Sequence, residues 1–292
     1  MEDLFTTQEE RDNEQLERVM LLPLSELRPF KDHPFKIQND EEMERIVESI
    51  RKVGVLSLGL ARPLEDGGYE LVSGHRRLAA CQQLELETMP VVVREMTDDE
   101  AVIAMVDANL QREHILPSEK AFAYKMKLEA LSHQGQTSVQ LGQKSSRSIV
   151  ANDANTSETQ VQRFIRLTNL IPEILAKVDE GKIAFNPAVE LSYLSEEQQR
   201  ELLAAMEKNQ CTPSHAQAIQ LKRAAQAGTL DSEAIQALMQ QEKPNQQEQI
   251  KLRREDFRSF FPPHYTGEQI KRDILKGLEL LKRQRERSRD AR

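Results

Sequence analysis

The first part of the chain alternates short apolar segments with amphipathic ones. From about Asp40 to Val53 the apolar residues recur at helical spacing, which predicts a helix that Asp40 caps and Gly54 ends. Short apolar runs predict strands at 55–62, 69–72 and 91–93, with a hairpin signal at 66–68. Two further helices are predicted, one over 78–86 and one capped by Asp98 or Asp99. Residues 21–116 therefore predict a small mixed α/β domain.

Beyond Pro117 the pattern changes, and only helices are expected. Pro117 itself suits a helix start, and the polar segment 132–146 is expected to be a loop or a frayed connection. The expected organisation is a flexible tail at 1–20, the α/β domain, an all-α domain at 117–225, and a linker with a helical C-terminal region and basic tail at 226–292. The fold class is thus α+β, with an apolar stripe at 266–281 that suits either a dimer seam or packing within the chain.

Residues 147–164 fit a helix-turn-helix. Val150 and Ala151 lie on the apolar side of the first helix, Asn155 tolerates the turn, and Ser157 can cap the second helix in a capping box with Gln160. The residues left to read or contact DNA are Ser157, Thr159, Gln160, Gln162, Arg163 and Arg166. A plain helical hairpin would show much the same pattern, so the motif alone leaves both interpretations open.

Composition narrows the function without deciding it. The net charge of −8 is unusual for a DNA-binding protein, yet residues 119–177 hold eight basic and five acidic side chains, a local positive excess of three. The 4% aromatic content and the absence of Trp argue against extensive base stacking. Two distant cysteines, an acidic N-terminus and no long apolar stretch predict a cytoplasmic protein without membrane span or signal peptide.

The segment 71–80 carries the strongest chemical signal. Two apolar residues lead into Ser73-Gly74-His75, and the adjacent Arg76 and Arg77 begin a Leu- and Ala-rich helix. A glycine turn before a helix lets the backbone approach an anion, and guanidinium groups bind phosphate oxygens. These residues suit a polyphosphate cradle, although taken alone they favour an ordinary strand–turn–helix with solvated arginines, because short glycine motifs often match by chance.

A second polar segment makes the chain resemble a known family. Ser73-Gly74-His75-Arg76-Arg77 resembles the G-[EH]-R-R box of ParB-type partition proteins, and residues 108–112 resemble their E-N-x-Q-R box. Residues 34–36 resemble the first box of the family, and the helix-turn-helix follows where the family has one. The resemblance runs from about residue 22 to past residue 183.

The resemblance implies that a cytidine nucleotide and Mg²⁺ bind the first domain and switch a dimeric clamp on double-stranded DNA. The implied nucleotide-binding residues are Ser73, Gly74, His75, Arg76, Arg77, Asn109 and Arg112. Asn109 would also help to place the metal, because hard cations prefer oxygen donors. A ParA-type ATPase partner and a nucleoid-associated location are implied as well.

The chain departs from the family at three places. Ala108 replaces the glutamate that the family uses at its metal and hydrolysis site. Asp107 lies one position earlier, and one helical residue rotates a side chain by about 100°, so it is not a simple replacement. His75 replaces an acid, and Ser57-Leu58 replace a Gln-Pro pair. CTP hydrolysis is therefore expected to be weak or absent.

Three functions remain open. The first is a partition protein with a nucleotide switch, and the second is a transcriptional or replication regulator whose first domain is only a scaffold. The third is a nucleotide-dependent enzyme without a DNA role. Sulfiredoxin, an ATP-using enzyme, shares the first-domain architecture, but it needs a cysteine where this chain has His75, and Cys81 lies about two turns along the helix.

Overall fold

The structure, a computed structural model, describes residues 18–241 apart from 38, 113 and 138–145, with scattered residues between 261 and 280. The chain divides into two units, Met1–Gln241 and Glu242–Arg292. The predicted tail before residue 18, part of the helix at 266–281 and the basic end lie outside the described residues. Within the described part, no helix is both long and apolar enough to cross a membrane.

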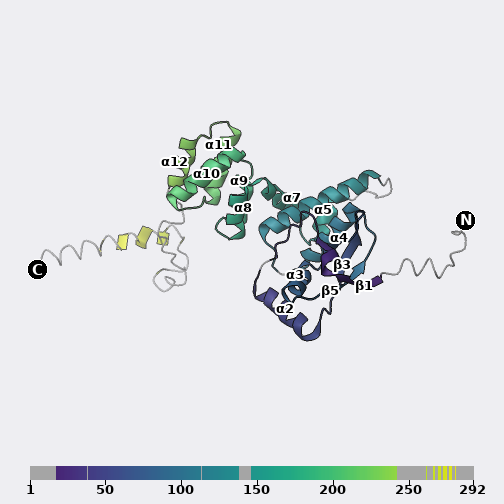
Figure 1. The fold of residues 1–292 in the computed structure, drawn as a ribbon. Helices are drawn as coiled ribbons and strands as arrows, with labels where there is room; N and C mark the ends of the chain where they lie inside the picture. The colour runs from purple at the N-terminus through teal and green to yellow at the C-terminus, as the bar shows by residue number, and fades with distance from the viewer. Residues whose placement is uncertain are drawn as a thin grey trace, which may run out of the picture. The chain divides into compact units, whose positions relative to one another are not determined.

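A five-stranded mixed sheet forms the first part of unit 1 (Figure 1). Its strands are β1 (Arg18–Pro23), β2 (Leu27–Pro29), β3 (Gly59–Pro63), β4 (Tyr69–Ser73) and β5 (Thr88–Val93). The spatial order is β1-β5-β3-β4-β2, with antiparallel β1–β5 and β3–β4 pairs and parallel β3–β5 and β2–β4 pairs. A short 3₁₀ helix, η1 (Leu24–Glu26), separates β1 from β2. The predicted α/β domain is confirmed, and its first strand begins inside the segment predicted as a tail.

Several boundaries differ from the sequence prediction by a few residues, and hydrogen bonds explain two of these differences. The predicted strand at 55–62 begins only at Gly59, because the carbonyls of Ser57 and Leu58 accept hydrogen bonds from Arg77. The helix expected from Asp98 or Asp99 is instead capped by Thr97, which forms a reciprocal capping box with Glu100.

Helices cover both faces of the sheet. They are α2 (Glu41–Val53), α3 (His75–Gln83) and α4 (Asp98–Leu110). Asp40 caps α2 by accepting a hydrogen bond from the Met43 N–H (2.8 Å), and Gly54 ends it with φ of +76°, as predicted. Leu71 packs with α2 and α3 whereas Val72 packs with α4, because successive residues of β4 face opposite sides.

The remaining described elements are helical. They are α5 (Pro117–Thr137), α6 (Ser146–Asp153), α7 (Glu158–Arg166), η2 (Leu167–Asn169), α8 (Pro172–Asp179), α9 (Phe185–Leu191), α10 (Glu196–Asn209), α11 (His215–Gln226) and α12 (Ser232–Gln240). The predicted loop at 132–146 is partly wrong, since α5 continues through Thr137.

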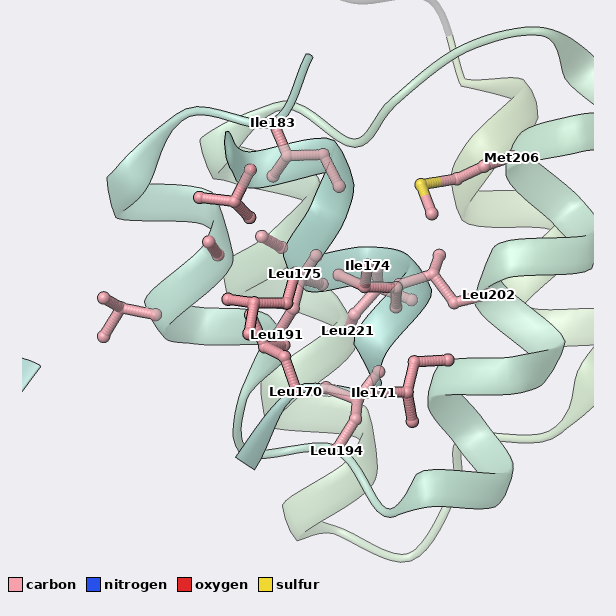
Figure 2. Close-up of a cluster of buried hydrophobic side chains, with 14 of the residues drawn as sticks. Leu170, Ile171, Ile174, Leu175, Ile183, Leu191, Leu194, Leu202, Met206 and Leu221 are labelled. Atoms are coloured by element: carbon pink, nitrogen blue, oxygen red, sulfur yellow. The ribbon is translucent and has the colours of Figure 1, made fainter. Parts of the chain in front are cut away.

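The largest core lies among α8 to α12 (Figure 2). Its fully buried side chains include Ile174, Leu191, Leu202 and Leu221. The segment after residue 226, expected to be a linker, contributes Met239 of α12 to this core. Burial of apolar surface, rather than chain position, therefore sets where this helical bundle ends.

Candidate functional site

The turn between β4 and α3 is built on a glycine that no other residue can replace without strain. Gly74 has φ of +108°, and a Cβ atom there would lie 3.2 Å from the Gly59 Cα. Gly59 is itself tightly enclosed, because a Cβ at this position would lie 3.0 Å from the Val91 Cγ1. Two strands therefore approach closely beneath the turn, and α3 begins directly at His75.

A cavity of about 190 Å³ opens at this turn. It is lined by His33, Phe35, Lys36, Ile37, Ile46, Ser73, Gly74, His75, Arg76, Arg77, Ala108, Asn109 and Arg112. Every residue that the family resemblance implied for the nucleotide is in this set. A larger cavity of about 830 Å³ shares Lys36, Arg76 and Arg112 with it. The fold thus gathers basic groups from three separate segments at one place.

Arg76 is held by acidic residues of the same chain. Its guanidinium forms ion pairs with Asp40 and Glu42 at the start of α2, at 2.6 Å for Glu42. The Met43 N–H, and then Arg76, hold the pKa of Asp40 below its usual value. Only 14% of the Arg76 side chain is exposed. An incoming anion would therefore compete with two carboxylates for this guanidinium.

Arg112 and Arg77 have different roles at the cavity. Burial, and then the positive charge of Arg76, lowers the pKa of Arg112, while the carboxylate of Glu119 opposes this shift. Arg77 instead donates to the carbonyls of Ser57 and Leu58 at 2.6 and 2.5 Å, which fixes the loop before β3. This positioning role of Arg77 was not visible in the sequence.

The His75 side chain has a structural role. It is 6% exposed, and its Nε2 accepts a hydrogen bond from the Phe30 N–H at 3.2 Å. Burial, with the nearby His33 ring at 3.9 Å between centroids, lowers the pKa of His75 to about 3. The neutral imidazole therefore supports the turn, and its side chain brings no positive charge to an anion.

The second box places its amide at the cavity and its acid elsewhere. Asn109 donates from Nδ2 to the Met105 carbonyl at 2.8 Å, so Oδ1 is the atom it retains for a ligand. Asp107 does not line the cavity and forms an ion pair with Lys127. The rotation expected for one helical residue thus holds, and neither Asp107 nor Ala108 supplies a carboxylate there.

Cys81 is poorly suited to act as a nucleophile. Its side chain is fully buried on α3, and burial raises the pKa of the thiol. The alternative of a sulfiredoxin-like enzyme needs a reactive thiolate beside the arginine that binds phosphate. The position and the protonation of Cys81 both argue against it.

Helices α6 and α7 are two short helices joined by a turn, at the place where the sequence predicts a helix-turn-helix. Asn155 adopts φ of +49° in the turn, and the Ser157 Oγ accepts a hydrogen bond from the Gln160 N–H at 3.2 Å. The capping box is incomplete, because the Gln160 Oε1 accepts a hydrogen bond from Arg163 instead. Val161 is fully buried and packs with Val150, as the apolar pattern predicted.

Fewer of the predicted side chains are free on the outer face of α7 than expected. Thr159 and Gln162 are exposed, while Arg163 donates to the Asn186 Oδ1 at 2.6 Å and lies over the Phe185 ring. Arg166, expected on the outer face, is turned toward the bundle instead. Its guanidinium stacks 3.7 Å from the Tyr193 centroid and donates to the Ser192 carbonyl at 2.9 Å.

Comparison with known proteins shows what this chain is similar to. Residues 8–110 match the ParB N-terminal domain. The chromosome-partitioning protein Spo0J of Thermus thermophilus is 36% identical over 179 residues, 61% of this chain and 61% of that protein. The nucleoid occlusion protein of Listeria monocytogenes serovar 1/2a is 30% identical over 201 residues, 67% of this chain and 65% of that protein.

One solved structure is similar over much of the same region. It is the C-terminally truncated chromosome-partitioning protein ParB of Caulobacter crescentus, complexed with CTP-gamma-S. Its sequence identity to this chain is 26% and the TM-score is 0.31, with 61% of this chain and 94% of that chain covered. This chain spans just under two thirds of the length of the two relatives above.

Proposed function

We propose that this chain, a ParB-type protein by its N-terminal domain, is a sequence-specific DNA-binding partition protein whose hold on duplex DNA is switched by a cytidine nucleotide. One observation carries the proposal: a single cavity collects both arginine-containing boxes, Arg76 from α3 and Arg112 after α4. The same unit carries a helix-turn-helix whose second helix exposes Thr159 and Gln162.

The cavity suits a nucleotide triphosphate because its basic groups converge. Arg76 and Arg112 offer charge-assisted hydrogen bonds to phosphate oxygens, and the first turn of α3 offers backbone N–H groups after Gly74. The preference for cytosine rests on the family resemblance alone.

Magnesium fits this cavity only as a companion of the phosphates. Asn109 supplies one oxygen donor, and the described residues contain no cluster of three or more metal-binding side chains. Mg²⁺ commonly keeps several waters and binds phosphate with few protein ligands. Since Asp107 pairs with Lys127 and Ala108 has no carboxylate, we expect nucleotide binding with weak or absent hydrolysis.

The surface proposed to contact DNA is the exposed edge of α7. Gln162 can hydrogen-bond to base edges, and Thr159 can contact bases or phosphates. Ser157 and Gln160 lie at the helix start, where a cap and an Arg163 contact already use them. Arg163 keeps a part-exposed guanidinium that can reach a phosphate. A homodimer, a ParA-type ATPase partner and a nucleoid location complete the proposal.

A DNA-binding regulator without a nucleotide switch is the second candidate. The ion pairs of Arg76 with Asp40 and Glu42 favour it, because they already satisfy much of the guanidinium. In that case the first domain would act as a scaffold. The two candidates differ in whether CTP displaces these carboxylates.

Titration of the full chain with CTP and Mg²⁺ distinguishes the candidates. Arg76→Ala should weaken CTP binding at least about tenfold, since a hydrogen bond to a charged group contributes about 1.5–3 kcal/mol. Arg45→Ala, which removes an exposed guanidinium from α2, is the matched control and should bind normally. Equal CTP affinity of the Arg76→Ala and unmodified proteins would remove the switch and leave the regulator.

A further inference from the structure

Among the described residues of unit 1, Lys127 is the largest fully buried side chain that carries a charge. It lies on α5, and only 1% of its side chain is exposed. Its ammonium contacts two carboxylates: Asp107 of α4, and Asp153 of α6 at 2.6 Å. A buried ammonium is costly unless it is paired, so both contacts matter to the local structure.

The two carboxylates belong to elements with different proposed roles. Asp107 lies in the last turn of α4, two residues before Asn109 at the cavity. Asp153 is the last residue of α6, directly before the turn that leads to α7. One ammonium group therefore joins the last turn of α4, beside the cavity, to the end of α6, beside α7.

An apolar contact runs beside this ion-pair bridge. Leu110, next to Asn109, packs against the core beneath α4 and also against the core of the helix-turn-helix. Tyr124 of α5 is buried in the second of these cores. The end of α4 and the end of α6 are thus held to the same stretch of α5 by two independent contacts.

We propose that Lys127 is a positioning residue that couples ligand occupancy of the cavity to the placement of the helix-turn-helix, an inference that rests on the function proposed above. A ligand that draws Asn109 and Arg112 inward changes the last turn of α4. That change alters the distance between Asp107 and Lys127, and therefore the share of the ammonium that Asp153 holds. By linkage, DNA binding at α7 must then change nucleotide affinity by the same factor.

The bridge can be removed without leaving a buried charge behind. Asp107 and Asp153 are 46% and 44% exposed, so both remain hydrated when the ammonium is absent. Lys127→Met keeps most of the side-chain volume in the same place. Lys125→Met removes the same charge from an exposed position of α5 and serves as the matched control.

The test measures CTP affinity with and without a DNA duplex recovered by selection from random sequence. In the unmodified protein and in Lys125→Met, the duplex should change the dissociation constant for CTP by about fivefold or more, which is the usual range of coupling. In Lys127→Met this factor should fall toward one, while each ligand alone still binds.

Hydrogen exchange on the ligand-free protein tests the same bridge without nucleotide or DNA. Asp153→Asn on α6 should speed the exchange of amides at 105–112 on α4, although the two segments are distant in sequence. Unchanged exchange there, together with unchanged coupling in Lys127→Met, would overturn the inference. If CTP does not bind at all, the proposed function fails. The exchange result alone then decides whether Lys127 couples α6 to α4.

Discussion

The cavity at Gly74 and the helix-turn-helix are assembled in opposite ways. The cavity draws on residues 33–46, 73–77 and 108–112, which only the sheet and its helices bring together. The α6–α7 pair needs little beyond residues 146–166, where a capped turn joins two short helices. A local motif tolerates changes elsewhere, whereas a site built from distant segments depends on the backbone between them.

The arginines show the same contrast. At the cavity, Arg76 is paired with acids that an anion can displace, while Arg77 is fixed to backbone carbonyls. On α7, Arg163 lies at the rim, while Arg166 is stacked under Tyr193. Each region thus uses one arginine to shape the site and leaves the other nearer the ligand.

The largest expected effect is at the glycine turn, which supports only the cavity. Gly74→Ala should lower the free energy of unfolding by about 3 kcal/mol, because its positive φ and the nearby Gly59 backbone both oppose a Cβ. Gly54→Ala has a similar positive φ but open space, and should cost about 1 kcal/mol. Urea denaturation measures both, and equal losses would show that the close approach is unimportant.

Substitutions at Gln162 and Arg166 of α7 should separate binding from stability, because Gln162 is exposed and Arg166 is partly buried. Gln162→Ala should weaken binding to the selected duplex by about 1–3 kcal/mol, with an unchanged unfolding midpoint. Arg166→Ala should instead lower the midpoint, because it removes the contacts to Tyr193 and Ser192. Fluorescence anisotropy and thermal melting give the two readouts. A melting temperature unaffected by Arg166→Ala would contradict its assigned role in packing.

Lowering the pH should reduce the free energy of unfolding of the α/β domain. Amides and hydroxyls do not titrate in this range, so DNA contacts that they make should be less affected. The pKa of His75 is lowered to about 3 in the folded chain, so the unfolded chain binds a proton first as the pH falls below about 6.5. Stability should therefore be fully present above that pH and should decline toward pH 3. His75→Gln, which keeps an acceptor for the Phe30 N–H, should flatten the dependence measured by urea titration. A slope identical to that of the unmodified protein would assign the decline to other groups.

The smallest effect concerns the carboxylates that compete for Arg76. Asp40→Asn and Glu42→Gln together should raise CTP affinity by less than about 1 kcal/mol, because partly exposed ion pairs contribute little in water. Glu44→Gln, also in the first turn of α2, is a suitable control. Calorimetric titration at low and moderate salt detects the difference. Weaker binding in the double variant would show that these acids assist the ligand rather than oppose it.

Sequence reasoning was reliable where the cause was local. The α2 cap at Asp40, the left-handed Asn155 and the Ser157 cap all follow from the preferences of one residue and its immediate neighbours. The residues that the family resemblance implied for the nucleotide lie together at one cavity, and periodicity alone does not contain that pairing. The rotation of Asp107 away from the cavity followed from helix geometry.

Only the tertiary structure decided which partner each polar side chain has. The sequence places Asp40 and Glu42 more than thirty residues from Arg76, and Asp107 twenty residues from Lys127. Hydrogen bonds and ion pairs act over a few ångströms, and the chain path that closes those separations depends on how the sheet and α5 pack. The residues therefore specified the chemistry available to this protein, while packing determined which arginine stays accessible and which lysine joins two sites.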